Sequence, residues 1–359
     1  MKILSVVGAR PQFIKAAAVS RALRQHRRVR EVLLHTGQHY DANMSAVFFQ
    51  ELDIPAPDYH LGIGGGTHAQ NTGRMMEAIE AVLLEEQPDW VIVYGDTDST
   101  LAGALAAVKI HIPVAHVEAG LRSFNRQMPE EINRILTDHI ADLLFAPTQT
   151  AVHHLQNEGV PQERIHLVGD VMCDAARYYA HKAQRHSRIL STLSLEPHTY
   201  LLATVHRAEN TDHPARLLAI MEALNTVGAQ RPVVLPLHPR TQRALHQIGH
   251  PPERFPHIRF TQPVGYLDMI QLEQHAWRIA TDSGGVQKEA YFFRVPCITL
   301  REETEWVELV QTGWNRLVPP LDAQPIIQAL TAPFPPGQEI ALYGGGTASQ
   351  RIAEILQKA

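Results

Sequence analysis

Three acidic side chains stand where a group that transfers protons could be placed. Asp96 follows the short apolar run Trp90–Tyr94, and Glu118 follows the run Val114–Val117. Glu130 comes a few residues later, just after a proline. Carboxylates gathered at neighbouring strand ends can serve as general acid and general base. We therefore interpret these three residues as candidates for proton transfer.

Each of these acids also has an ordinary structural interpretation. Asp96 and Glu118 could cap helices that follow their strands. Glu130, or its neighbour Glu131, could equally pair with Arg134 on an exposed helix face. Chance explains any one of them more readily than the whole set, so the set favours a catalytic site.

A second segment has the pattern of an anion-binding site. It reads Thr281-Asp282-Ser283-Gly284-Gly285-Val286-Gln287-Lys288-Glu289-Ala290. An apolar run ends at Ala280 and a helix is expected over 286–293, so backbone amides and a helix N-terminus would meet an anion such as a phosphate. Glu289 could accept hydrogen bonds from a ribose. The alternative is an ordinary core helix capped by Asp282 or Ser283.

Basic residues follow other apolar runs. Arg10 stands after the first run, where a dinucleotide fold would show a glycine triplet, so an arginine bound to a phosphate is more natural there than NAD. Lys15 could support the same anion or face solvent. His206 and His238 both end apolar runs next to arginines, but no HxH or HxxxH spacing supports a metal site.

The composition limits the class of protein. The chain has 359 residues, 45% of them hydrophobic and 19% charged, which predicts a globular protein of two domains. A net charge of -5 argues against nucleic acid as the main partner. Cys173 and Cys297 are far apart, which suggests a reducing compartment and no structural zinc. We find no signal peptide and no apolar run of membrane-spanning length, and expect a cytoplasmic protein without membrane contact.

The elements that would position these residues are parallel sheets. Short runs rich in Val, Ile and Leu alternate with helical segments, which is typical of a parallel sheet covered on both faces. The runs are Ile3–Val7, Val32–His35, Trp90–Tyr94, Val114–Val117, Leu143–Ala146 and Ile165–Val168, then Tyr200–Val205, Pro232–Leu237, Ile258–Thr261, Trp277–Ala280 and Cys297–Leu300. They predict two doubly wound α/β domains in tandem, over residues 1–172 and 173–346. Since parallel sheets bind ligands beyond the carboxyl ends of their strands, we expect the site in a cleft between the domains.

The chain resembles the non-hydrolysing UDP-N-acetylglucosamine 2-epimerases along essentially its whole length. The matching motifs are Gly8-Ala9-Arg10-Pro11 with Lys15, Gln38-His39, Gly95-Asp96-Thr97, His116-Val117-Glu118-Ala119-Gly120-Leu121-Arg122, Pro129-Glu130-Glu131-Ile132-Asn133-Arg134, His206-Arg207, His238-Pro239 and Thr281–Glu289. The resemblance implies the GT-B architecture, with two Rossmann-like domains, an active site in the cleft, and a C-terminal helix, about 347–359, that packs back on the first domain.

The resemblance also implies a reaction. The family eliminates UDP to give a 2-acetamidoglucal and adds UDP back with a proton delivered to the other face of C2. The implied catalytic residues are Asp96, Glu118, Glu130 and His206, and which carboxylate serves which face stays open. The implied substrate-binding residues are Arg10, Lys15, Arg134, His238, Ser283, Gly284, Gly285, Glu289 and Arg301. No metal and no cofactor are implied, the partner is a UDP-sugar, and the protein is expected to be a homodimer.

Departures from the family pattern bear on the substrate. Many members have Thr-Glu-Arg-Pro-Glu where this chain has Thr304-Glu305-Trp306-Val307-Glu308, and glutamate where it has Lys288. The changes resemble a branch that epimerises UDP-2,3-diacetamido-2,3-dideoxy-glucuronate in the synthesis of surface polysaccharides such as lipopolysaccharide. Lys288 and Arg122 could meet the sugar carboxylate, although Lys288 could also point to solvent and pair with Glu302.

Four other functions stay open on the sequence alone. They are a plain UDP-N-acetylglucosamine 2-epimerase, a hydrolysing epimerase, a GT-B glycosyltransferase and a non-catalytic nucleotide-sugar sensor. A transferase would share the fold and the UDP site but would need an acceptor. A sensor would have no need of three acids near its ligand, so the acids count against it.

Overall fold

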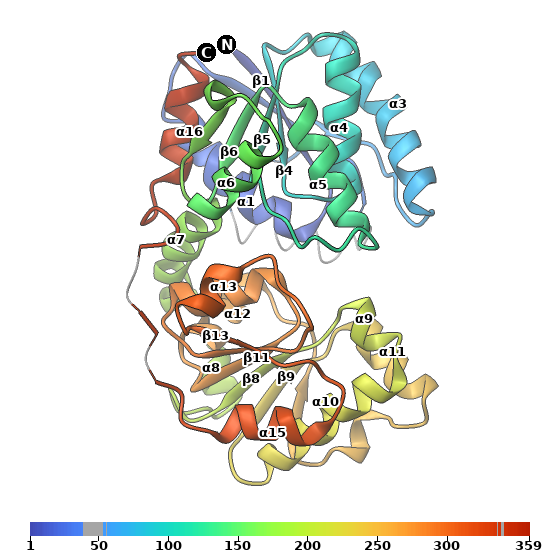
Figure 1. The fold of residues 1–359 in the computed structure, drawn as a ribbon, viewed down its shortest axis with the longest axis vertical. Coiled ribbons are helices and arrows are strands. Elements are labelled where there is room, and N and C mark those ends of the chain that lie inside the picture. The colour runs from blue at the N-terminus through green and yellow to red at the C-terminus, as the bar shows by residue number, and fades with distance from the viewer. Residues whose placement is uncertain (39–52, 55, 336, 339–340) are drawn as a thin grey trace. The chain divides into compact units, whose positions relative to one another are not determined.

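The computed structural model describes residues 1–359 except 39–52, 55, 336 and 339–340. The chain forms two compact units (Figure 1). The first contains Met1–Ala175 and Ala341–Ala359, and the second contains Ala176–Ile340. Helix α7 (Val171–His186) begins in the first unit and ends in the second.

The first unit is built on a seven-stranded sheet with the order β3-β2-β1-β4-β5-β6-β7, in which every pair is parallel. Its strands are β1 (Lys2–Val7), β2 (Arg30–His35), β3 (Tyr59–His60), β4 (Trp90–Tyr94), β5 (Val114–Val117), β6 (Leu143–Ala146) and β7 (Ile165–Leu167). Its helices, besides α7, are α1 (Arg10–Leu23), α3 (His68–Glu86), α4 (Asp98–Lys109), α5 (Pro129–Ile140), α6 (Gln149–Asn157) and α16 (Ala348–Leu356).

The second unit is built on a six-stranded parallel sheet with the order β10-β9-β8-β11-β12-β13. Its strands are β8 (Leu201–Thr204), β9 (Val233–Pro236), β10 (Ile258–Thr261), β11 (Arg278–Thr281), β12 (Cys297–Thr299) and β13 (Asn315–Leu317). Its helices are α8 (Ile189–Thr192), α9 (Ala208–Thr211), α10 (Pro214–Gly228), α11 (Pro239–Gln247), α12 (Tyr266–Gln274), α13 (Gly284–Phe292), α14 (Val307–Gln311) and α15 (Ala323–Thr331).

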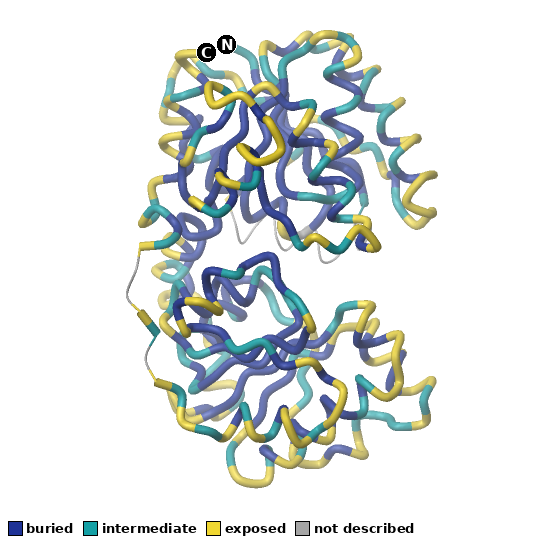
Figure 2. Tube along the Cα trace, viewed as in Figure 1, coloured by how far each residue is buried: buried dark blue, intermediate teal, exposed yellow. Residues whose placement is uncertain are grey.

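Successive side chains along a strand point to opposite faces of the sheet, and apolar side chains cover both faces. In β8, Leu201 and Ala203 pack into one apolar cluster with α10 and α15, whereas Leu202 packs into another with α12 and α13. The central strands are accordingly buried along their length (Figure 2). A strand buried on both faces must be apolar at every position, which explains why the apolar runs identify these strands in the sequence.

The predicted fold class is confirmed, since both sheets are parallel and helices flank them. Two strands escaped prediction, β3 (Tyr59–His60) and β13 (Asn315–Leu317). Both are short edge strands, paired on one side with β2 and β12. They are 2 and 3 residues long, and their sequences, Tyr-His and Asn-Arg-Leu, contain no apolar run. In the described parts of the chain, no helix is long and apolar enough to cross a membrane.

The C-terminal segment belongs to the first unit. Helix α16 packs against α1, and both termini lie close together there (Figure 1). The segment approaches the chain at Gly169, whose backbone contacts Tyr343 and Gly344 so closely that side chains would not fit. A Cβ at Gly344 would lie 2.9 Å from the Gly169 Cα. Glycine is therefore required at this crossing of two backbones.

Two neighbouring glycines allow this contact to be tested. Gly344 and Gly345 have nearly equal φ angles of 75° and 72°, but a Cβ at Gly345 meets nothing within 4 Å. We expect Gly345→Ala to lower the free energy of unfolding by about 1–2 kcal/mol, the usual cost of a left-handed residue. Gly344→Ala should cost clearly more, because the backbone of Gly169 must also move. Equal losses in urea denaturation would show that the crossing tolerates a methyl group.

Candidate active site

The first two predicted acids lie at the carboxyl ends of adjacent strands. Strands β4 and β5 pair in parallel, with Tyr94 opposite Val117. Asp96 follows β4 by two residues, and Glu118 follows β5 directly. Parallel pairing therefore brings the two acid-bearing turns together at one edge of the sheet, as the sequence predicted.

Glu118 has a strained backbone conformation and takes part in a buried ion pair. Its φ of 75° is unusual for a residue with a side chain, and such strain concentrates at functional sites. The Lys15 ammonium group on α1 donates a hydrogen bond to Glu118 Oε1, and both side chains are buried. Lys15 does not face solvent. The predicted cation and the predicted acid are thus partners in this structure.

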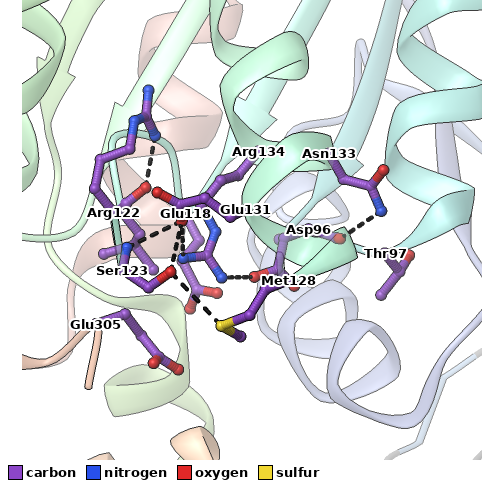
Figure 3. A network of polar contacts seen from close by, with 12 residues as sticks. Asp96, Thr97, Glu118, Arg122, Ser123, Met128, Glu131, Asn133, Arg134 and Glu305 are labelled. Carbon is purple, nitrogen blue, oxygen red and sulfur yellow. Dashed lines mark hydrogen bonds and ion pairs between the residues drawn. The ribbon is translucent and has the colours of Figure 1, made fainter. Parts of the chain in front are cut away.

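Asp96 shares an arginine with a neighbouring acid (Figure 3). Arg134 Nη2 donates to Asp96 Oδ2 at 2.5 Å, and Arg134 Nη1 donates to Glu131 Oε2 at 2.8 Å. The Asn133 side chain donates to the Asp96 carbonyl at 3.0 Å. The Asp96 side chain keeps 29% of its surface exposed, whereas Arg134 keeps 3%. The exposed part of the Asp96 carboxylate is accessible to a substrate, and the buried Arg134 orients this carboxylate.

The acids Glu130 and Glu131 have different surroundings. Glu131 is buried and accepts hydrogen bonds from the amides of Ser123 and Phe124, both at 2.9 Å, and from Arg134. It therefore fixes the loop that precedes α5. Glu130 is half-buried in the first turn of α5. Of the two, Glu130 is the one whose surroundings leave it able to meet a ligand.

Arg122 lies elsewhere than its predicted role requires. Its guanidinium group donates to Glu158 at 2.7 and 2.6 Å and to Asp138 at 2.7 Å, and only 1% of the side chain is exposed. A group so enclosed and so fully paired does not meet a sugar carboxylate. Arg122 instead stabilises the turn after β5.

A buried pair of a histidine and a carboxylate, His116 and Asp138, contacts the turns that carry Asp96 and Glu118. His116 Nδ1 lies 2.7 Å from Asp138 Oδ1, and neither side chain is exposed. Burial raises the pKa of the Asp138 carboxyl, but the hydrogen bonds and charges of His116 and Arg122 outweigh that effect and hold the pKa below its usual value. Asp138 therefore contributes stability above its unfolded pKa of about 4, and the contribution is lost as the pH falls further.

In the second unit, a buried carboxylate organises the candidate anion site. Asp282 directly follows β11 and accepts hydrogen bonds from the amides of His206 and Arg207 at 3.0 Å and from the Asn210 side chain at 3.1 Å. His206 Nδ1 lies 3.5 Å from Asp282, and 38% of its side chain is exposed. Asp282 thus joins the loop after β8 to the end of β11, and it is not the cap of α13.

Helix α13 begins at Gly284, two residues earlier than predicted. Its N-cap position is Ser283, whose side chain makes no capping hydrogen bond. The amides of Gly284 and Gly285 lie in the first turn, where helix geometry provides no intrahelical acceptor. Side chains from the loop after β12 border this turn. Glu305 Oε1 would lie 2.5 Å from a Cβ at Gly284, and Arg301 donates to Glu305 at 2.9 Å.

Lys288 is buried, so the prediction that it points to solvent and pairs with Glu302 is wrong. Only 2% of Lys288 is exposed, and its ammonium group lies 4.0 Å above the centre of the Trp306 ring. Glu302 instead pairs with Arg216. The contact is a cation–π interaction, in which the electron-rich face of the ring attracts the ammonium group. Two of the departures from the family pattern, at 288 and 306, are therefore in contact with each other.

The remaining predicted residues of the second unit lie near strand ends. Glu289 is buried and accepts a hydrogen bond from the Tyr266 hydroxyl at 2.8 Å. Burial and the charge of Glu289 raise the pKa of Tyr266 well above its usual value, so this hydroxyl remains a donor. His238 caps α11 by accepting from the Arg240 amide at 3.1 Å, and its ring lies 5.4 Å from that of His206.

The structure thus groups the predicted residues in two sets, one in each unit. Asp96, Glu118, Glu130, Lys15 and Arg134 gather in the first unit, and His206, His238, Ser283, Gly284, Gly285, Glu289, Arg301 and Lys288 belong to the second. The side chain of Arg10 and the whole of His39 lie outside the described residues. Among the residues that are described, no three His, Cys, Asp or Glu side chains group as metal ligands.

Sequence reasoning missed His116, Asp138 and Asp282. His116 interrupts the apolar run of β5, which was a usable signal, since a histidine inside a buried strand needs partners. Asp138 gave no such signal, because an acid on a helix is usually exposed. Asp282 was noticed only as a possible cap.

Comparisons with known proteins show the family to which the chain belongs. A family model described as UDP-N-acetylglucosamine 2-epimerase matches residues 21–357. The chain is similar to UDP-2,3-diacetamido-2,3-dideoxy-D-glucuronate 2-epimerase of Pseudomonas aeruginosa, with 54% identity over 362 aligned residues covering 100% of both chains. It is also similar to a structure of Methanocaldococcus jannaschii UDP-GlcNAc 2-epimerase in complex with UDP-GlcNAc and UDP, with a TM-score of 0.93, 42% identity and 100% coverage of both chains. A Neisseria meningitidis UDP-GlcNAc 2-epimerase bound to UDP-GlcNAc gives a TM-score of 0.91 at 31% identity, again covering both chains fully.

Replacing Arg134 tests how much a buried acid without a cation lowers the free energy of unfolding. We expect Arg134→Met to lower the free energy of unfolding by about 3 kcal/mol, because Glu131 then keeps its buried charge without a cation. The exposed Arg126 in the preceding loop is a matched control, and Arg126→Met should change stability by less than about 0.5 kcal/mol. Similar stabilities of the two variants in chemical denaturation would contradict this account.

Proposed function

The chain belongs to the UDP-N-acetylglucosamine 2-epimerase family, and from this premise we propose how its own residues invert C2 of a UDP-2-acetamido sugar. Members of this family are isomerases, and so is this chain. The observation that carries the mechanism is the pair of acids at the ends of β4 and β5. Asp96 and Glu118 lie on adjacent turns, and each is paired with a cation, Arg134 and Lys15 respectively.

The chemistry explains why the reaction begins at C1. The hydrogen on C2 is not acidic, because no carbonyl group is attached to that carbon. A carboxylate, with an ordinary pKa near 4, cannot remove it directly. When the C1–O bond breaks and its electrons leave with UDP, C1 becomes electron-deficient and C2 becomes acidic. The C2–H electrons then form a C1=C2 double bond, and the proton passes to a carboxylate.

The return step uses the same groups in reverse. A proton is delivered to C2 on the opposite face, and UDP adds back to C1, so that the atoms balance and only the configuration at C2 has changed. Inversion therefore needs two groups, one on each face of the sugar. We assign these roles to members of the set Asp96, Glu118 and Glu130, with His206 assisting at the departing diphosphate.

UDP is assigned to the second unit. Amides in the first turn of α13, with Arg301 and His206, offer donors and positive charge to the diphosphate, and UDP is the leaving group that they stabilise. Glu289, oriented by the Tyr266 hydroxyl, is assigned to the ribose. We propose that residues 1–172 with the C-terminal helix supply the acids, residues 173–346 supply the nucleotide contacts, and both act on one substrate.

The substrate that we propose is UDP-2,3-diacetamido-2,3-dideoxy-glucuronate, which becomes the mannuronate isomer. The similarity to the Pseudomonas aeruginosa enzyme of that name supports this assignment. The contact between Lys288 and Trp306 supports it too. Lys288 brings a positive charge to α13, and the carboxylate of a glucuronate is an additional negative charge that this cation would attract.

We further propose that the protein is a cytoplasmic homodimer that supplies a precursor of surface polysaccharide such as lipopolysaccharide. Apolar side chains left exposed on two helices that flank α4 support subunit contact. They are Leu84 on α3, 59% exposed, and Leu136 on α5, 45% exposed. A sedimentation coefficient of a monomer at micromolar concentration would contradict the dimer.

Deuterium incorporation tests the reaction class. In deuterated water the enzyme should place deuterium at C2 of the product, because the proton removed exchanges before another is returned. Proton NMR of the UDP-sugar follows both the exchange and the inversion. Inverted product that retains its original hydrogen at C2 would point to an oxidation and reduction route, and steady accumulation of free UDP would point to a hydrolysing enzyme.

Amide variants test the three acids separately. Asp96→Asn, Glu118→Gln and Glu130→Gln should each lower kcat by at least about a hundredfold, the usual contribution of a positioned acid or base, with a smaller effect on UDP binding. Asp89→Asn is the matched control, since Asp89 is exposed at the amino end of the same strand as Asp96. A fully active Glu118→Gln protein would remove Glu118 from the mechanism.

Lys288 offers a test of the substrate. We expect wild-type protein to prefer the diacetamido-glucuronate over UDP-N-acetylglucosamine in kcat/KM. Lys288→Met should reduce that preference at least about tenfold, because it removes a charge–charge interaction with the sugar carboxylate. Lys109→Met, at an exposed position on α4, should leave the ratio unchanged. An unchanged ratio in the Lys288 variant would leave this lysine without a role in selection.

A further inference from the structure

His116 lies on β5 with no exposed surface, and both of its ring nitrogens face hydrogen-bond acceptors. Nε2 lies 2.7 Å from the Gly95 carbonyl oxygen. Nδ1 lies 2.7 Å from Asp138 Oδ1 on α5. Both distances are those of good hydrogen bonds.

These two contacts determine the state of the ring. A carbonyl oxygen and a carboxylate oxygen can only accept, so each needs an N–H from His116. A neutral imidazole has one N–H and would leave the other contact without a proton. Both bonds form together only when the ring is an imidazolium, with a proton on each nitrogen.

The surrounding charges accommodate that cation. His116 and Arg122 are the cations of the cluster, and Asp138 and Glu158 are the carboxylates, so the charges balance. His139 lies 3.3 Å from Glu158 at the partly exposed edge of the cluster. A buried charge is tolerated when it is paired and hydrogen-bonded, and both conditions hold for His116.

The pair joins the two turns that carry the candidate acids. The Gly95 carbonyl, which His116 holds, belongs to the peptide that leads into Asp96. The other carboxylate oxygen of Asp138 accepts a hydrogen bond from the Gly120 amide at 3.0 Å, two residues beyond Glu118. One ion pair therefore holds the backbone on either side of the site.

We propose that His116, as an imidazolium paired with Asp138, is a positioning residue that fixes the separation of Asp96 and Glu118. This inference rests on the proposed function, in which both acids act on one sugar carbon. Glu118 needs such support because its left-handed backbone is strained. Catalytic groups displaced by about 1 Å can lose on the order of a hundredfold in rate, so a rigid link between the turns has a direct effect on turnover.

The protonation state can be measured without any substrate. In protein labelled with nitrogen-15 at histidine, both ring nitrogens of His116 should give imidazolium signals at about pH 7. The signal is assigned by its absence from His116→Gln. A neutral ring at about pH 7 would overturn the proposal, whatever reaction the enzyme performs.

Kinetics test the positioning role. His116→Gln has donor hydrogens on one nitrogen only, so it cannot donate to Gly95 and Asp138 on opposite sides as the ring does. We expect kcat to fall at least about tenfold while KM and UDP affinity change little. His166→Gln is the matched control, on β7 of the same sheet and half-buried, and should retain activity. If His116→Gln only loses stability and keeps its kcat, the histidine is structural and the proposal fails.

A second variant covers the case in which His116→Gln does not fold. Asp138→Asn removes the counter-charge, so His116 should become neutral in the nitrogen-15 spectrum and kcat should fall with it. A neutral ring with unchanged kcat would contradict the positioning role. An imidazolium that persists without Asp138 would contradict the pairing.

Discussion

A charge taken out of water needs an opposite charge or hydrogen bonds, and this constraint shapes the first unit at the ends of β4 and β5. Lys15 holds Glu118, Arg134 holds Asp96 and Glu131 together, and His116 holds Asp138. The three cations lie on α1, α5 and β5. A shift of any of these three elements would therefore break one of the ion pairs. The rigidity that results is what a reaction at one sugar carbon requires of two carboxylates.

In the function proposed for the second unit, the ligand brings its own negative charge as a diphosphate. Asp282 uses the amides after β8 to fix the loop, and the first turn of α13 then offers amides to an anion. Glu305 borders this turn in the structure, and Arg301 is bound to it. The site is therefore lined by both signs of charge, which suits a ligand whose diphosphate is negative and whose ribose is neutral.

Much of this could be read from the sequence, for a physical reason. Strands buried on both faces must be apolar, so the runs revealed the sheets, and parallel pairing placed the polar residues that follow them at one edge. The edge strands β3 and β13 were missed because they are only 2 and 3 residues long and contain no apolar run. The partners of charged residues were harder still. Arg122 was expected to meet a ligand, but it is enclosed by its pairs with Glu158 and Asp138. The burial of Lys288 against Trp306 could not be predicted either, because only the folded chain brings the two residues together.

The central claim is that the bond between C1 and the UDP oxygen breaks during epimerisation, and an oxygen isotope tests it most directly. A UDP-sugar carrying oxygen-18 in the bridge between C1 and the β-phosphorus is incubated with the enzyme. If UDP leaves and returns, rotation of its terminal phosphate will move the label into non-bridging positions, and phosphorus NMR will show it. Inversion at C2 with the label still wholly in the bridge would contradict the account.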